Sequence, residues 1–241
     1  MIDSRVDFQQ DMSVTGSFGT GVLVGGEGGA QLTLHSGSEI GFGCGTGVSV
    51  GRGSIAVARN DTWIHDNERY GLFTSDSGRI QVRGDTIAEN NLWGGMGIRL
   101  GGTGLITEQA VLKMNWDHPD PDNRFFAWRS GVHAWMGSIL LISGPDPDSG
   151  LGPTIEDNTG PGVLVDLNST LYIHNVTVQD NSDGGVSVLH QSAAEFDEAV
   201  TATANTGGDL GCDSESLVYG DLSGVGINNC SGSQQGGGQG P

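Results

Sequence analysis

A short motif, glycine followed by alternating apolar residues, recurs along the whole chain and constrains the fold more than any other feature. A typical copy reads Gly21-Val22-Leu23-Val24, and the last copy is degenerate. The eight copies begin at Gly21, Gly47, Gly71, Gly97, Gly131, Gly162, Gly185 and Asp209. Their spacings are 26, 24, 26, 34, 31, 23 and 24 residues. A period in this range predicts stacked units that bury their apolar faces against each other.

Each repeat predicts three short strands, because aliphatic residues alternate over stretches too short for helices and are separated by Gly, Ser, Asp and Asn. The first strand carries the glycine motif, the second resembles Leu171-Tyr172-Ile173, and the third resembles Ile155-Glu156-Asp157. Side chains at equivalent positions of the second and third strands are expected inside the coil. They are Ile55, Val57, Ile64, Ile80, Val82, Ile87, Ile139, Leu141, Ile155, Leu171, Ile173 and Val178.

An asparagine follows the first residue of the third strand by three positions in four repeats. These residues are Asn67, Asn90, Asn158 and Asn181. We expect them to stack at one corner, where each amide can bond the backbone and the asparagine of the next coil. The row is therefore interpreted as structural.

With its Gly-apolar-x-apolar strands and its turns of the type Val178-Gln179-Asp180-Asn181, the chain resembles the right-handed parallel β-helix proteins of the pectin-lyase-like superfamily over residues 14–230. The resemblance implies an all-β solenoid of about eight coils with three short strands each. We expect one domain over residues 1–232 and a flexible Gly/Gln-rich tail over 233–241. Members include polysaccharide lyases, glycoside hydrolases, epimerases, tailspikes and non-catalytic surface proteins, so the fold leaves the activity open. The catalytic motifs of the family are missing, and no catalytic residue is carried over.

The chain of 241 residues has a formal net charge of −19, with ten basic residues. Such a surface repels nucleic acid and anionic membranes, and no apolar run is long enough to span a bilayer. We therefore expect neither nucleic acid nor membrane insertion. Proteins of this resemblance are mostly exported, which implies an extracellular or cell-surface location, and the uncapped first coil favours a piece of a larger polypeptide.

Cys212 and Cys230 lie 18 residues apart in the last repeat. A disulfide between them would close the final coil and would suit an oxidising compartment. The alternative is a pair of buried thiols, since sequence does not fix the pairing.

Two long insertions, over residues 116–129 and 144–153, mark the middle of the chain. Insertions in a solenoid form loops, and loops carry function. The outward row of the first strands places Arg99 beside His133 there, close to Trp135. Aromatic rings stack on sugar faces and polar groups bond sugar hydroxyls. The ligand-binding candidates are Arg99, Arg124, Trp128, Arg129, His133 and Trp135. In the alternative interpretation, these rings pack the insertion and Arg99 pairs with a loop aspartate.

Both insertions contain Pro-Asp-Pro-Asp, and alternate aspartates suit a hard cation such as calcium. The calcium candidates are Asp120, Asp122, Asp146 and Asp148. Neither loop has a recognised calcium spacing, so solvated turns are the alternative.

The outward row of the second strands is expected to expose an apolar stripe formed by Ile106, Leu140 and Tyr172. Taken together, the sequence predicts a secreted or surface-displayed module that binds an extracellular polysaccharide or other glycan. The alternatives are a polysaccharide lyase or glycoside hydrolase with a divergent site around Arg99 and His133, and a structural stalk or adhesin segment.

Overall fold

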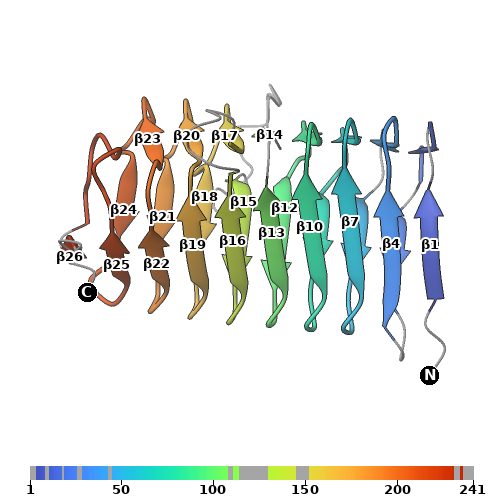
Figure 1. Cartoon of the computed structure of the whole chain (residues 1–241), viewed down its shortest axis with the longest axis horizontal. Helices are drawn as coiled ribbons and strands as arrows, with labels where there is room; N and C mark the ends of the chain where they lie inside the picture. Colours follow the sequence, from blue (N-terminus) through green and yellow to red (C-terminus); the bar gives the residue numbers. More distant parts are fainter. Residues whose placement is uncertain are drawn as a thin grey trace.

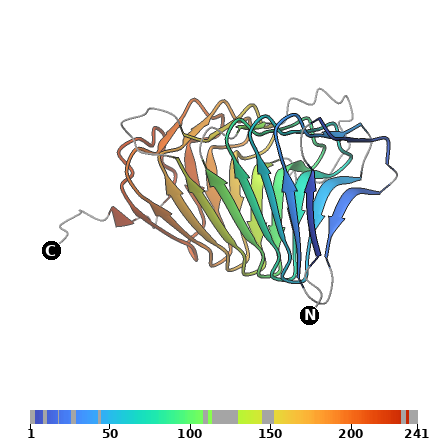
Figure 2. The same cartoon turned by 45° about the vertical axis from the view of Figure 1, so that its right-hand side comes forward.

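The protein is a parallel β-solenoid of about seven turns, which Figure 1 shows from the side and Figure 2 shows turned by 45°. The computed structural model describes residues 4–8, 11–17, 19–25, 29–42, 45–107, 111–113, 130–144, 152–230 and 234–235. Over these residues the chain forms strands and turns without any helix. The all-β fold predicted from the repeat is confirmed.

Each turn of the chain contributes one strand to each of three parallel sheets. Sheet A holds the second strands of the repeats, β1 (Ser4–Phe8), β4 (Ala30–Leu34), β7 (Ile55–Arg59), β10 (Arg79–Arg83), β13 (Thr103–Thr107), β16 (Ile139–Ser143), β19 (Thr170–His174), β22 (Ala193–Phe196), β25 (Leu217–Gly220) and β26 (Gln234–Gln235). Sheet B holds the third strands, β2 (Ser13–Thr15), β5 (Glu39–Gly41), β8 (Trp63–His65), β11 (Ile87–Glu89), β14 (Val111–Lys113), β17 (Thr154–Glu156), β20 (Thr177–Gln179) and β23 (Thr201–Thr203). Sheet C holds the first strands, β3 (Thr20–Val24), β6 (Thr46–Val50), β9 (Tyr70–Thr74), β12 (Gly94–Arg99), β15 (Ser130–Trp135), β18 (Val163–Val165), β21 (Val186–Val188) and β24 (Leu210–Cys212).

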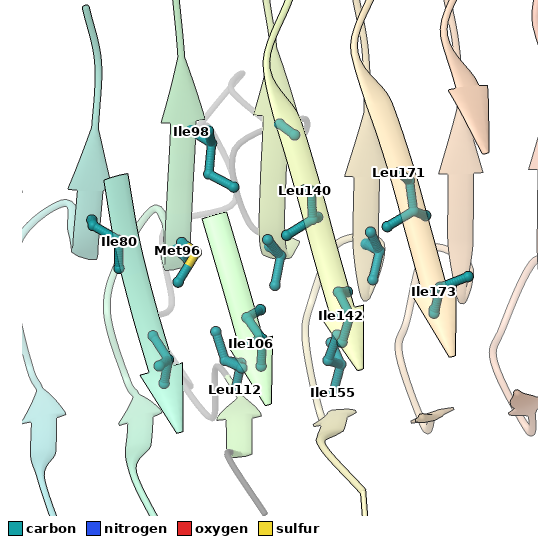
Figure 3. Packing of buried hydrophobic residues seen from close by; sticks show 14 of the residues in the cluster. Ile80, Met96, Ile98, Ile106, Leu112, Leu140, Ile142, Ile155, Leu171 and Ile173 are labelled. Carbon is teal, nitrogen blue, oxygen red and sulfur yellow. The ribbon is translucent and has the colours of Figure 1, made fainter. Parts of the chain in front are cut away.

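The core is a narrow column of aliphatic side chains that all three sheets direct inward (Figure 3). Seven of the twelve residues predicted inside are buried there: Ile64, Ile80, Val82, Ile155, Leu171, Ile173 and Val178. The prediction was wrong for the other five, which lie on the outer face or are only half-buried: Ile55, Val57, Ile87, Ile139 and Leu141. In these strands apolar residues occupy both faces, so alternation alone does not decide which face is buried.

Pairing with neighbouring strands instead decides which side chains point into the core. In β16, Leu140 pairs with the buried Leu171 and is itself fully buried, whereas Leu141 pairs with Tyr172 and is 38% exposed. The predicted outer stripe is corrected accordingly, because Ile106 and Leu140 lie inside. The apolar stripe on sheet A consists of Leu105, Leu141 and Tyr172, which occupy consecutive strands in register.

The predicted asparagine row exists at the corner between sheets B and C, with Asn91 in place of Asn90. Asn91 takes this place because Ala88, not Ile87, is the inward residue of β11. Asn67 donates from Nδ2 to Oδ1 of Asn91 at 2.7 Å. Asn158 donates to Asn181 at 2.7 Å, and Asn181 donates to Asn205 at 2.8 Å. All five side chains are buried, so these bonds give the Nδ2 donors of Asn67, Asn158 and Asn181 partners that water cannot supply.

The asparagine row also explains the recurrent glycine. A Cβ on Gly47 would lie 2.5 Å from the carbonyl oxygen of Gly71 and 3.0 Å from Nδ2 of Asn67. The chain passes so close to the next coil at this corner that a side chain does not fit. The glycine and the asparagine of the repeat are therefore two parts of one corner.

The C-terminal end of the solenoid is closed by residues 221–230, which continue the winding and run parallel to the last strands of sheets B and C. Val225 bridges to Ala202 of β23, and Asn228 bridges to Leu210 of β24. The predicted disulfide between Cys212 and Cys230 is present, with a Cα–Cα distance of 4.8 Å. It links this closing segment covalently to β24.

We expect the Cys212→Ser, Cys230→Ser double variant to lower the free energy of unfolding by about 3 kcal/mol, as the loop-entropy model gives for a loop of this length. Urea denaturation of the oxidised wild type and the variant measures the difference. Reduced wild type should match the variant. Equal stability of oxidised and reduced wild type would show that the bridge does not hold the end closed.

Candidate functional site

The structure describes three of the predicted ligand-binding residues, and all three lie at the end of β12 or in β15. Arg99 is exposed, while His133 and Trp135 are only 4% and 6% exposed. Arg124, Trp128 and Arg129 lie outside the described residues. The same holds for Asp120, Asp122, Asp146 and Asp148.

The predicted neighbour relation between Arg99 and His133 is wrong by two residues. In the parallel pairing of β12 with β15, Gly97 stands opposite His133, and Arg99 stands opposite Trp135. The reason is that two of the three glycines of β12, Gly95 and Gly97, are each followed by an apolar residue. Gly95 is the corner glycine, since a Cβ on it would lie 2.9 Å from the carbonyl oxygen of the equivalent Gly131.

Gly97 instead makes room for an aromatic ring on the outer face of sheet C. A Cβ at this position would lie 2.8 Å from Cε2 and 2.9 Å from Cζ of Tyr70. The ring of Tyr70 therefore covers Gly97 and is itself 2% exposed. The sequence interpretation missed Tyr70, although it directly precedes the repeat glycine Gly71.

Tyr70 is the centre of an aromatic cluster, defined here by Tyr70, Phe73, Trp93, His133 and Trp135. Its ring centroid lies 5.8 Å from that of Phe73, 5.9 Å from that of Trp93 and 6.0 Å from that of Trp135. His133 stacks on Trp135 at 4.2 Å. Strand β9, the turn before β12 and strand β15 thus contribute rings to one spot on sheet C, and aromatic pairs at these separations stabilise each other.

Burial controls the electrostatics of the cluster. Oη of Tyr70 lies 3.3 Å from Nδ1 of His133, and burial raises the pKa of Tyr70 well above its usual value. Burial also lowers the pKa of His133 to about 4, although the charge of Asp166 acts in the opposite direction. His133 is therefore neutral at pH 7 and forms part of the packed cluster.

This pKa predicts acid sensitivity. His133 binds a proton near pH 6.5 when unfolded but only near pH 4 when folded, so acid favours the unfolded state. The His133 contribution to stability is complete above pH 6.5. About 3 kcal/mol of it is lost by pH 4, at 1.36 kcal/mol per pKa unit. Urea denaturation of wild type and His133→Gln at pH 7 and pH 4 measures this loss, which should be smaller in the variant. An equal loss in both proteins would contradict it.

Cations lie at the rim of the cluster. The guanidinium of Arg69 lies 5.0 Å from the ring centroid of Trp93, a cation–π contact, and Arg69 is exposed. Arg99 is exposed at the end of β12. On a protein with a net charge of −19, these are two of only ten basic residues.

A groove of about 430 Å³ adjoins the cluster on the N-terminal side. Small residues of sheet C and its following turns form the floor, among them Ser49, Gly51 and Ser75, while Arg52 and Asp76 stand at the side. Ser49 is paired in register with Phe73 of the next strand, so the groove lies one strand away from the aromatic cluster. Its volume lies within the range of small-molecule sites, and hydroxyls, a guanidinium and a carboxylate converge on it.

A second group that the sequence interpretation missed surrounds His65 on sheet B. Nδ1 of His65 lies 2.7 Å from Asp66 Oδ2, and Nε2 lies 3.2 Å from Glu39 Oε1. Trp63 stacks on the imidazole at 3.5 Å and donates from Nε1 to Glu89 at 2.8 Å. The side chain of His65 is fully buried, so it cannot touch a ligand directly.

Neither a metal centre nor a membrane-spanning helix occurs in the described part of the chain. No three His, Cys, Asp or Glu side chains there are grouped so that they could hold a metal ion. Nor does any helix there have the length and apolarity needed to cross a membrane.

Comparison with known proteins adds no family. The chain matches no protein-family model, curated protein or solved structure.

Proposed function

We propose that this β-helix is a module that binds extracellular carbohydrate along the outer face of sheet C. The observation that carries the proposal is the groove of about 430 Å³ lined by Ser49, Arg52 and Asp76, which lies one strand away from Phe73 of the aromatic cluster. A sugar presents hydroxyls along its edge and C–H groups on its faces. Such a ligand suits a groove lined by polar side chains with aromatic rings close by.

The site differs from the sequence expectation in its position along the rod. His133 and Trp135 support it from within the packed cluster, while the half-buried Phe73 and Trp93 present ring surface to a ligand. Arg52, Arg69 and Arg99 are three of the nine arginines of the chain, and all are exposed around this face. They supply hydrogen-bond donors to sugar hydroxyls and attract any carboxylated or sulfated sugar.

The disulfide fits an extracellular location, because such bonds persist in oxidising compartments. Pectin-lyase-like ancestry and secretion remain part of this proposal. Binding by the calcium candidates of the two insertions is a further expectation that calcium titration can test.

A glycan array identifies the ligand, and calorimetry with the hit then tests the site. Phe73→Ala and Arg52→Ala should each weaken binding by about 1–3 kcal/mol, the range for anchor residues of an interface. Trp63→Ala, which removes an exposed tryptophan from sheet B, should leave affinity unchanged.

Failure of all array glycans to bind, or equal affinity in all three variants, would remove the carbohydrate proposal and favour a structural stalk. Analysis of any glycan hit for shortened or unsaturated products separates a binding module from a hydrolase or lyase.

A further inference from the structure

The two ends of the solenoid differ in the hydrogen bonding of their last strands. At the C-terminal end, β25 pairs with β26, while β23 and β24 each have a bridge to the closing segment 221–230. At the N-terminal end, β1, β2 and β3 are the last strands of sheets A, B and C, and their outer edges have no strand partner among the described residues. An unpaired strand edge is a template for pairing with another chain.

The N-terminal end also exposes the core. Val6 pairs with the buried Leu32 and belongs to the inward face of sheet A, yet it is 48% exposed. A cavity of about 250 Å³ opens there, and its lining includes Val6, Phe8, Val22, Val24, Ala30 and Leu32. Apolar surface next to unpaired backbone indicates an interface.

The sequence of β1 is complementary to itself. Arg5 and Asp7 flank Val6 and lie on the outer face, where Arg5 Nε is 3.2 Å from Asp7 Oδ2 in the same strand. When two copies of Ser4–Phe8 run antiparallel with Val6 opposite Val6, Arg5 of each copy stands opposite Asp7 of the other. Oppositely charged pairs directly across an antiparallel ladder are favourable, and the two valines meet on the core side.

We propose that β1 of one chain pairs antiparallel with β1 of a second copy, so that two solenoids form a dimer through their N-terminal ends. The two-fold axis passes beside Val6, which makes the contact self-complementary and closed. Head-to-tail stacking is disfavoured, because the segment 221–230 and β26 already occupy the C-terminal edges. The assembly therefore stops at two copies and does not grow into a fibre.

Sedimentation velocity at about 0.15 M salt tests this arrangement, over protein concentrations from about 1 µM to about 1 mM, the range of moderate to weak dissociation constants. Wild type should change from monomer to dimer with concentration. Arg5→Asp places aspartates opposite aspartates, and Asp7→Arg places arginines opposite arginines, so each variant alone should be monomeric. Because the two variants complement each other, an equimolar mixture should regain the dimer.

Arg79→Asp is the matched control, because it makes the same charge change at an exposed position on β10, away from the end. It should dimerise like wild type, and equal thermal melting of all variants checks that each one folds. Wild type that stays monomeric at about 1 mM, or that forms longer polymers, would overturn the proposal. A dimer that persists in both single charge variants, or a mixture that stays monomeric, would also overturn it.

Discussion

Replacing Asn181 with Leu is expected to lower the free energy of unfolding by about 3–5 kcal/mol, since each buried polar group left without a partner costs about 1–3 kcal/mol. Asn181 accepts from the backbone N–H and the Nδ2 of Asn158, and donates to Asn205 and to the carbonyl of Ile155. Leucine fills similar space but bonds none of them. Equilibrium urea denaturation measures the loss.

Asn168→Gly is the control for this substitution. Asn168 is exposed in a turn with φ of 61°, where glycine relieves the backbone strain. Its stability should stay within about 0.5 kcal/mol of wild type, as for most surface changes. Similar losses in both variants would mean that the asparagine row contributes no more than an ordinary turn.

Two adjacent leucines in β16 give the second large effect. Leu140→Ala should cost about 2–5 kcal/mol, because the side chain is fully buried and its removal leaves a cavity. Leu141→Ala should cost less than about 1 kcal/mol, because the side chain is 38% exposed on the outer face.

The same denaturation experiment compares the two variants. The pair tests the facing of β16 directly, since both substitutions remove the same atoms. A larger loss for Leu141→Ala would reverse the inner and outer faces of sheet A and return the facing predicted from the sequence.

The sequence predicted the fold because the geometry of one corner requires both the repeat glycine and the asparagine. Gly47 has no room for a side chain, and Asn67 has no water to bond. Both constraints depend on the neighbouring coil alone, so they recur wherever a coil recurs. The same logic predicted the disulfide, since both cysteines lie at the end of the last repeat.

The facing of β7 and the register of β12 could not be predicted in the same way. In β7, the small residues Ala56 and Ala58 lie inside and the larger Ile55 and Val57 lie outside, because their partners in β10 fix the parity. In β12, the outward Gly97 imitates the corner glycine. Glycine is needed at this outward position because the ring of Tyr70 occupies the space of a side chain. That contact joins residues 27 positions apart, so the local sequence does not reveal it.

The proposed site lies on the sheet that the sequence indicated, but the sequence pattern located only part of the aromatic cluster there. His133 and Trp135 do lie on the outer face of sheet C, but the rings of Tyr70 and Trp93 cover the same spot. Aromatic residues directly before the glycines of the first strand, as in Tyr70-Gly71 and Trp93-Gly94, were the signal that could have located the cluster. The groove beside it depends on small residues, which carry no signal of their own.

The asparagine row has a direction, and this direction bears on how such a rod can lengthen. Four of its five side-chain amides donate toward the C-terminus, and the last one, Asn205, donates to the carboxylate of Asp209 at 2.8 Å. Asp209 also accepts from the backbone N–H of Ile227, and as a carboxylate it has no proton to pass on. A coil duplicated before Asp209 would carry an asparagine, whose amide both donates and accepts, and would fit the row. A coil added after Asp209 would meet a carboxylate that has no hydrogen to donate to its asparagine. Gene duplication can therefore extend this solenoid from within, while its C-terminal end stays fixed.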